Sequence, residues 1–180
     1  HGRAMVDSFS LTALISDNTG FIGAIMLVLL GLVPSFAWLE FYRQEHRRHP
    51  EPPKLLVLAF LIGVAMTFLV LPIQLFLTKK LSALGIGSYS LSSFILLGFT
   101  EELFKFLSIY LVFRKSPRLK EPLDAMIYAI TGALGFAAVE NIASLFQIAQ
   151  GSVFNIAILE SLSLRFVGAT LLHSLASGLV

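Results

Sequence analysis

The 180-residue sequence has no cysteine and few charges, and both shortages narrow the classes of protein to which it can belong. Without cysteine the chain cannot form disulfides, thiolate metal sites or a cysteine nucleophile. Charged residues make up only 13% of the chain and hydrophobic residues 56%, whereas soluble domains carry about 25% charged residues. A water-soluble fold could not bury so much apolar surface. The composition therefore indicates an integral membrane protein.

Several hydrolase motifs are also missing. The sequence has neither the HExxH motif of zinc proteases nor the GxGD motif of intramembrane aspartyl proteases. The nearest approach to the GxSG of rhomboid proteases is Ala176-Ser177-Gly178, which follows Leu175 and does not match. Serine and aspartyl mechanisms are therefore disfavoured. The basic residues fall in short loops without forming a large patch, so we expect no nucleic-acid partner.

Windows of about 20 apolar residues, the length that crosses a bilayer as a helix, pick out five segments. They cover Phe21–Phe41, Lys54–Leu77, Tyr89–Phe113, Pro122–Ile148 and Phe154–Val180. This pattern predicts an all-α, polytopic transmembrane helix bundle in which residues 1–180 form a single membrane-embedded domain. We read residues 1–5 as the remnant of an expression tag. A further span after Val180 stays open.

The distribution of basic residues predicts the orientation. Eight of them lie in the loops after the first and third spans: Arg43, Arg47, Arg48, Lys54, Arg114, Lys115, Arg118 and Lys120. Both loops are on one side of the membrane, which the positive-inside rule makes cytoplasmic. Lys79 and Lys80 oppose this orientation only weakly. We expect a multi-pass protein of the cell membrane with its N-terminus outside and loops 43–54 and 114–120 in the cytoplasm.

Polar and ionisable residues interrupt the last three spans. In chain order they are Glu101, Glu102, Lys105, Glu140, Asn141, Arg165 and His173. Each ionised group at the centre of a membrane helix costs about 3 kcal/mol, so five such groups cost on the order of 15 kcal/mol. A penalty of that size requires internal pairing or a function.

Spacing allows part of the pairing. Lys105 lies four residues after Glu101 and three after Glu102, so one helical turn can hold a salt bridge. The other glutamate of this pair and Glu140 are then two further carboxylates, and Arg165 is one cation, which can neutralise only one of them. Either one carboxyl group stays protonated or a bound cation joins the cluster.

Structural roles are the alternatives for each of these groups. The glutamates and the lysine of the third span could form only a salt bridge. Arg165 could snorkel or pair with Glu160, five residues earlier. His173 by itself would more often be a hydrogen-bonded core residue, but it is the only histidine within a predicted span.

The fourth span carries a ridge of small residues, which allows membrane helices to approach closely. Its members recur at every fourth position: Ala125, Ala129, Ala133 and Ala137. Glu140 lies three residues beyond this ridge and should face another helix. In parallel helices, Glu101 and Glu140 would differ by about 9 Å in distance from the cytoplasmic helix ends. We expect Glu101 and Glu140 to converge, and only the three-dimensional arrangement of the helices can test this.

Three motifs on successive spans resemble the PrsW family of membrane proteases, distant relatives of the CAAX prenyl-protease superfamily. The motifs are Glu101-Glu102-x-x-Lys105, then Asp124-Ala-Met-Ile-Tyr128 with Gly135-Phe136-Ala-Ala-Val-Glu140-Asn141, and finally Arg165 with His173-Ser-Leu-Ala-Ser177-Gly178. The resemblance covers Phe99–Gly178. The family often has a third glutamate where this chain has Thr100, and a threonine where it has Ser177.

The resemblance implies cleavage of membrane-anchored protein substrates, with anti-sigma factors among the family's examples. It also implies a metal-type mechanism in which Glu101, Glu102, Glu140 and His173 form the catalytic site. We expect Glu140 and His173 to bind a divalent metal, zinc in the first instance, while Glu101 or Glu102 accepts the proton of a water molecule. Manganese, cobalt and a metal-free mechanism stay open.

Three residues would support this chemistry. We expect Lys105 to hold the glutamate pair, and Asn141 or Arg165 to donate a hydrogen bond to the oxyanion. Two other classes of function compete. In a transporter or channel the same groups would form a proton or cation relay, and a scaffold without activity would only bind a partner helix.

Overall fold

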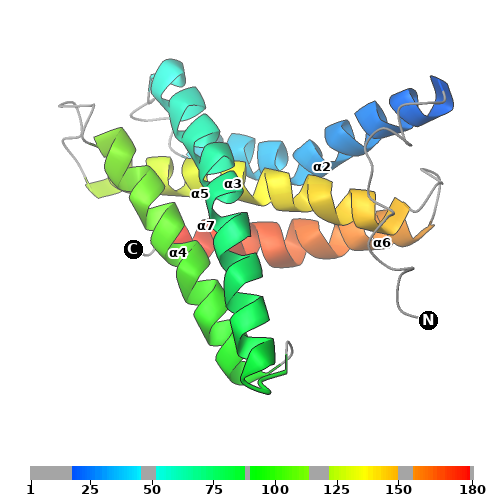
Figure 1. Ribbon diagram of the computed structural model, residues 1–180. Coiled ribbons are helices and arrows are strands. Elements are labelled where there is room, and N and C mark those ends of the chain that lie inside the picture. The colour runs from blue at the N-terminus through cyan, green and yellow to red at the C-terminus, as the bar shows by residue number, and fades with distance from the viewer. Residues whose placement is uncertain (1–17, 46–51, 88–89, 114–121, 150–155, 179–180) are drawn as a thin grey trace.

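The computed structural model describes residues 18–45, 52–87, 90–113, 122–149 and 156–178, and within these ranges the chain is almost entirely helical. The helices are α2 (Asn18–Glu45), α3 (Pro53–Ala83), α4 (Leu91–Phe113), α5 (Pro122–Ala149), α6 (Ile156–Leu164), the π-helix η1 (Arg165–Thr170) and α7 (Leu171–Gly178). Figure 1 shows their arrangement. The predicted all-α fold is confirmed.

All five predicted spans coincide with helices. Four are long and apolar enough to cross a membrane: Gly20–Gln44, Pro53–Ala83, Asp124–Ala149 and Ile156–Gly178. The last of these joins α6, η1 and α7 into one span. The remaining predicted span, the third, is α4, which is 23 residues long and differs in carrying Glu101, Glu102 and Lys105 near its middle. The prediction of a multi-pass membrane protein is therefore supported, and α3 extends six residues beyond its predicted end.

Helix α5 is the centre of the molecule. It packs against α2, α3, α4, α6 and α7, and nearly every side chain from Ile127 to Ala138 is buried. Ala133 and Ala137 have no exposed surface, and Ala129 is almost as deeply buried. These are three of the four members of the small-residue ridge, so its predicted packing role is confirmed.

Helix α3 crosses α5 at backbone contact distance. A Cβ atom on Gly135 would lie 2.1 Å from the Phe60 carbonyl oxygen, and one on Gly63 would lie 1.9 Å from the Gly132 carbonyl oxygen. Only glycine fits at such an approach, because the atom in the way belongs to the neighbouring backbone. These glycines fix where α3 crosses the central helix.

Helices α3 and α4 form a hairpin that runs steeply across the layer of α2, α5 and the α6–α7 span (Figure 1). The depth difference expected between Glu101 and Glu140 assumed parallel helices. Since α4 crosses α5 obliquely, residues at different distances from their helix ends can meet where the helices cross. The N-terminal residues 1–17 and most of the loops 43–54 and 114–120 lie outside the described residues, so the expected tag remnant at residues 1–5 and the orientation inferred from the basic loops stay predictions.

Candidate active site

Three helices bring ionisable side chains to one point. His173 of α7 places Nε2 2.9 Å from Oε2 of Glu140 on α5. On its other side, His173 Nδ1 lies 2.6 Å from Nζ of Lys105 on α4. Lys105 also donates to Oε1 of Glu102, at 2.6 Å. A continuous chain of polar contacts therefore runs Glu102, Lys105, His173, Glu140.

Lys105 is the most deeply buried charged residue in this chain of contacts, with only 2% of its surface exposed. Its ammonium group lies 5.2 Å from the centre of the Phe136 ring, whose face attracts a cation. A lysine so placed needs a carboxylate partner, because an unpaired buried charge is costly. Glu102 provides that partner one turn earlier on the same helix.

The contacts of His173 decide where its proton lies. An ammonium group can only donate, so Nδ1 accepts from Lys105. Nε2 then carries the ring proton and donates to Glu140. In this arrangement neither ring nitrogen has a free lone pair, and any cation that binds His173 has to replace one of its two present partners.

Glu101 differs from Glu102 in its partner. Its Oε1 accepts a hydrogen bond from Nε2 of Gln74 on α3, at 2.7 Å. Glu102 is paired with the ammonium group instead. The two adjacent glutamates therefore have different electrostatic environments, one beside a neutral amide and one in an ion pair.

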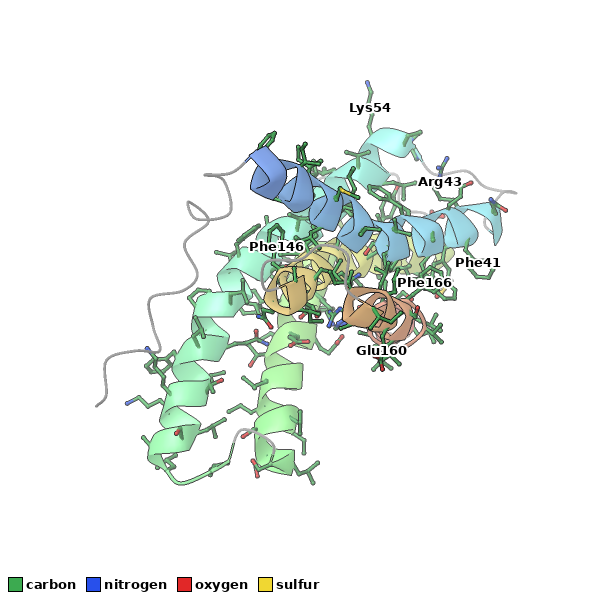
Figure 2. The ribbon with its side chains drawn as sticks, turned by 90° about the vertical axis from the view of Figure 1, so that its right-hand side faces the viewer. Phe41, Arg43, Lys54, Phe146, Glu160 and Phe166 are labelled. Atoms are coloured by element: carbon green, nitrogen blue, oxygen red, sulfur yellow. The ribbon has the colours of Figure 1, made fainter. Side chains whose placement is uncertain are left out.

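Arg165 and Asn141 form a second set of contacts beside Glu140. Arg165 Nε donates to Asn141 Oδ1 at 2.6 Å, and its NH2 group lies 3.6 Å from Glu140 Oε2. Asn141 is fully buried and donates through Nδ2 to Oγ1 of Thr170, at 3.0 Å. Pairing of Arg165 with Glu160 was the alternative. Instead, Arg165 contacts Asn141 and Glu140 of α5, and Glu160 projects from its helix on the side away from α2 (Figure 2).

The donor atoms suit a divalent cation. A carboxylate oxygen of Glu101, one of Glu140 and a ring nitrogen of His173 all lie within 4.8 Å of one another. Carboxylate oxygens and imidazole nitrogens are both ligand types that divalent ions such as zinc accept, and a catalytic site keeps one position open for water. Among the described residues Glu102 lies outside this group.

Comparison with known proteins identifies the family of this chain. The family model described as "PrsW family intramembrane metalloprotease" matches residues 51–180, which include the whole donor group. The chain belongs to the PrsW family. The match begins before the motif region and takes in α3, whose Gln74 contacts Glu101.

Curated relatives agree with the PrsW assignment. Protease PrsW of Bacillus subtilis (strain 168) is 30% identical over 116 residues, covering 64% of this chain and 52% of the relative. Protease PrsW of Geobacillus kaustophilus is 32% identical over 126 residues (69% and 53%), and that of Clostridioides difficile 31% over 121 residues (67% and 51%). The chain thus spans about half the length of these relatives. No solved structure matches it at a significant level.

All seven residues singled out in the sequence lie in this one region of the PrsW-family fold. Sequence reasoning missed Gln74, Thr170 and Phe136 as parts of it. Gln74 had one available signal, since it is an amide inside the apolar second span, where polar residues are uncommon. Phe136 stood in the motif that ends in Glu140-Asn141 but was given no role of its own, and Thr170 had no signal, because threonine is an ordinary residue of membrane helices.

Proposed function

We propose that this chain carries the catalytic centre of an intramembrane protease that hydrolyses peptide bonds of membrane-anchored proteins. The observation that carries the proposal is the convergence of Glu101, Glu140 and His173 from three helices to within 4.8 Å. Membership of the PrsW family supports peptide hydrolysis as the reaction. Three carboxylates in a membrane-embedded cluster are expensive, and hydrolysis supplies a reason for them.

The proposed metal is zinc, held by Glu140 and His173. When bound, such an ion lowers the pKa of a water ligand and polarises the scissile carbonyl. The nitrogen and oxygen donors of this cluster suit zinc, and the family description as metalloproteases supports a metal. Because His173 has both nitrogens engaged, loading the site requires exchange of the contact to Lys105 or to Glu140.

Glu101 is the proposed proton acceptor for the attacking water. Of the two adjacent glutamates it is the one within the donor group, and its contact is a neutral amide. Glu102 is a weaker choice because its carboxylate is already paired with the Lys105 ammonium. Glu102 and Lys105 together hold the imidazole of His173 from the side of Nδ1.

Arg165 is the proposed donor to the oxyanion. Its guanidinium group has donors beyond those that contact Asn141 and Glu140, and its side chain is 24% exposed. Asn141 is less suitable, since its amide donates to Thr170 and its oxygen accepts from Arg165. We assign Asn141 the task of holding the guanidinium group in position.

The proposed substrate is a protein anchored by a single membrane span, of the kind represented by anti-sigma factors. The proposed setting is the cell membrane, with the N-terminus outside and the basic loops 43–54 and 114–120 in the cytoplasm. Nothing in the cluster favours one substrate sequence over another. The catalytic groups sit among apolar helices, so a substrate has to present its peptide bond within or next to the bilayer.

Cleavage of a library of single-span reporter proteins in reconstituted vesicles tests the proposal. Glu101→Gln and His173→Ala should each abolish cleavage, and a chelator should do the same to the wild type. Glu160→Gln is the matched control, because it neutralises an exposed glutamate in the same span as His173 that is not a member of the donor group of described residues. Cleavage that survives both site variants would overturn the assignment. Absence of cleavage in the wild type would favour a transporter or a scaffold.

A further inference from the structure

The last span contains a π-helix directly beside the candidate site. Residues Arg165–Thr170 form η1, between the α-helical segments α6 and α7. π-helices are rare, and they often occur at functional sites because the wider turn changes which side chains share a face. Both Arg165, at the start of η1, and His173, three residues after its end, contact Oε2 of Glu140.

Counting along the helix shows why the wider turn matters. In a regular α-helix the eight residues from Arg165 to His173 would turn the chain by about 800°, which leaves the two side chains roughly 80° apart. A π-turn accommodates one additional residue, so the same stretch turns by about 700° and the two side chains fall within roughly 20° of one face. The π-helix thus brings Arg165 and His173 to the same carboxylate.

Asn141 secures the two ends of the π-helix from the side of α5. It accepts from Arg165, the first residue of η1, and donates to Thr170, the last. A single buried amide therefore spans the whole wide turn. It belongs to the residue next to Glu140 in sequence, so the turn and the carboxylate are fixed to the same point of α5.

Trp38 of α2 secures the turn from the other side. Its Nε1 donates to the carbonyl oxygen of Phe166 at 2.8 Å, and the indole packs against the Phe166 ring with centroids 5.5 Å apart. Figure 2 shows Phe166 between η1 and α2. The backbone N–H of Leu171, the residue after η1, donates to the Gly168 oxygen three residues earlier, so the hydrogen-bond spacing changes where the π-helix ends. The Phe166 carbonyl, inside η1, accepts a hydrogen bond from a side chain of another helix, and inserted side chains are a known cause of disturbed helical turns.

We propose that Trp38 is a positioning residue of the site: its indole N–H holds the π-helix in the wide-turn register that places Arg165 and His173 together on Glu140. Only the effect of Trp38 on catalysis rests on the proposed function. The coupling of the indole to the π-helix rests on the contacts of Trp38 with Phe166. Trp38 lies outside the motif region and does not contact the donor group.

The chain offers a direct spectroscopic reporter, because Trp38 is its only tryptophan. In protein labelled with ¹⁵N at the indole, one Nε1–H resonance reports on the bond to Phe166. Deleting Val167, an exposed residue of η1, should return the turn to α-helical register. We expect the deletion to move the indole resonance, because Phe166 loses its place in the wide turn. The His173 ring resonance, which is assigned by its loss in His173→Ala, should stay near its position, because seven α-helical residues turn the chain by about 700°, as eight residues with the π-turn do. An unchanged indole resonance would overturn the proposal whether or not the protein cleaves anything.

Kinetics test the catalytic consequence. Trp38→Phe keeps an aromatic ring on Phe166 but removes the donor, and we expect kcat to fall about tenfold with KM unchanged. Phe41→Leu is the matched control, because Phe41 packs edge-on against the indole and its side chain carries no group that could hydrogen-bond to η1. The control should keep the wild-type kcat.

A double variant separates positioning from general destabilisation. If Trp38 acts only through the π-helix, adding Trp38→Phe to the Val167 deletion should lower kcat no further. Independent, multiplying losses would overturn the proposal, as would a Trp38→Phe variant with full kcat. Lack of cleavage by the wild type would refute the proposed function and leave the resonance measurements to decide the coupling.

Discussion

Lys105 places a positive charge directly beside His173, the residue that a bound metal ion would also contact. Its ammonium group lies 2.6 Å from His173 Nδ1 and 2.6 Å from Glu102. Metal-ligating histidines ordinarily donate their second N–H to a carboxylate or a carbonyl oxygen, whereas here the second nitrogen faces a donor. Lys105 and a divalent ion are therefore competitors for the same imidazole.

This competition predicts that Lys105→Met binds Zn²⁺ about tenfold more tightly than the wild type, because removing the ammonium frees His173 and removes a repelling charge. Isothermal titration calorimetry measures the change. Lys79→Met is the control, since Lys79 lies near the far end of α3 and should leave the affinity unchanged. Weaker binding by Lys105→Met would mean that the lysine supports the ligands instead of competing with the ion.

Gln74 fixes the carboxylate that we assign as proton acceptor. Gln74→Leu removes the hydrogen bond to Glu101 with little change in volume, and we expect kcat to fall about tenfold while KM stays the same. Reporter cleavage at several substrate concentrations separates the two constants. Thr78→Val, one turn later on α3, removes a hydroxyl whose partner among the described residues is the Gln74 backbone oxygen, and it should be near wild type. A change in KM alone would place Gln74 in substrate binding.

At the scale of the helices, the crossing of α3 over α5 is the contact that brings Gln74 to the site. Gly135→Ala should destabilise the protein by about 1–3 kcal/mol, because the added methyl group meets the Phe60 carbonyl and a backbone cannot yield as a side chain can. Unfolding in mixed micelles measures the loss. Gly98→Ala is the control: a Cβ there has nothing within 4 Å, and alanine favours the helix. Equal stability of the two variants would contradict the tight crossing.

The helical elements also show which local features a sequence pattern misses. The apolar run of the last span predicted one continuous helix, and the span does continue from Ile156 to Gly178. Its π-helix could not be predicted, because no residue of RFVGAT requires the wider turn. The turn is stabilised by partners on other helices, Asn141 and Trp38, which lie 24 or more residues away in sequence.

For the molecule as a whole, a metal that bridges helices should stabilise the fold. Zn²⁺ at a hundredfold excess over its dissociation constant should add about 2.7 kcal/mol to the free energy of unfolding, and a chelator should reverse the gain. Thermal unfolding with and without Zn²⁺ shows this as a shift in Tm. The shift should vanish in His173→Ala and persist in Glu160→Gln. An equal shift in both variants would place the ion elsewhere.

The sequence by itself determined that this protein is membrane-embedded and all-helical, and it determined most of the residues of the candidate site. Apolar runs of bilayer length leave a chain no other way to satisfy its backbone, and charges inside such runs are too costly to be incidental. Spacing along one helix even placed Glu102 and Lys105 together.

Only the tertiary structure decided how these residues differ. Spacing left Glu101 and Glu102 equivalent as partners of Lys105, and the packing of α4 against α3 gave Glu101 a separate partner in Gln74. Gln74 and Trp38 joined the site and its support through the packing of α3 and α2, with no motif to mark them. The physical reason is that a one-dimensional pattern fixes which face of a helix is polar, whereas crossing angles and turn register fix which polar faces meet.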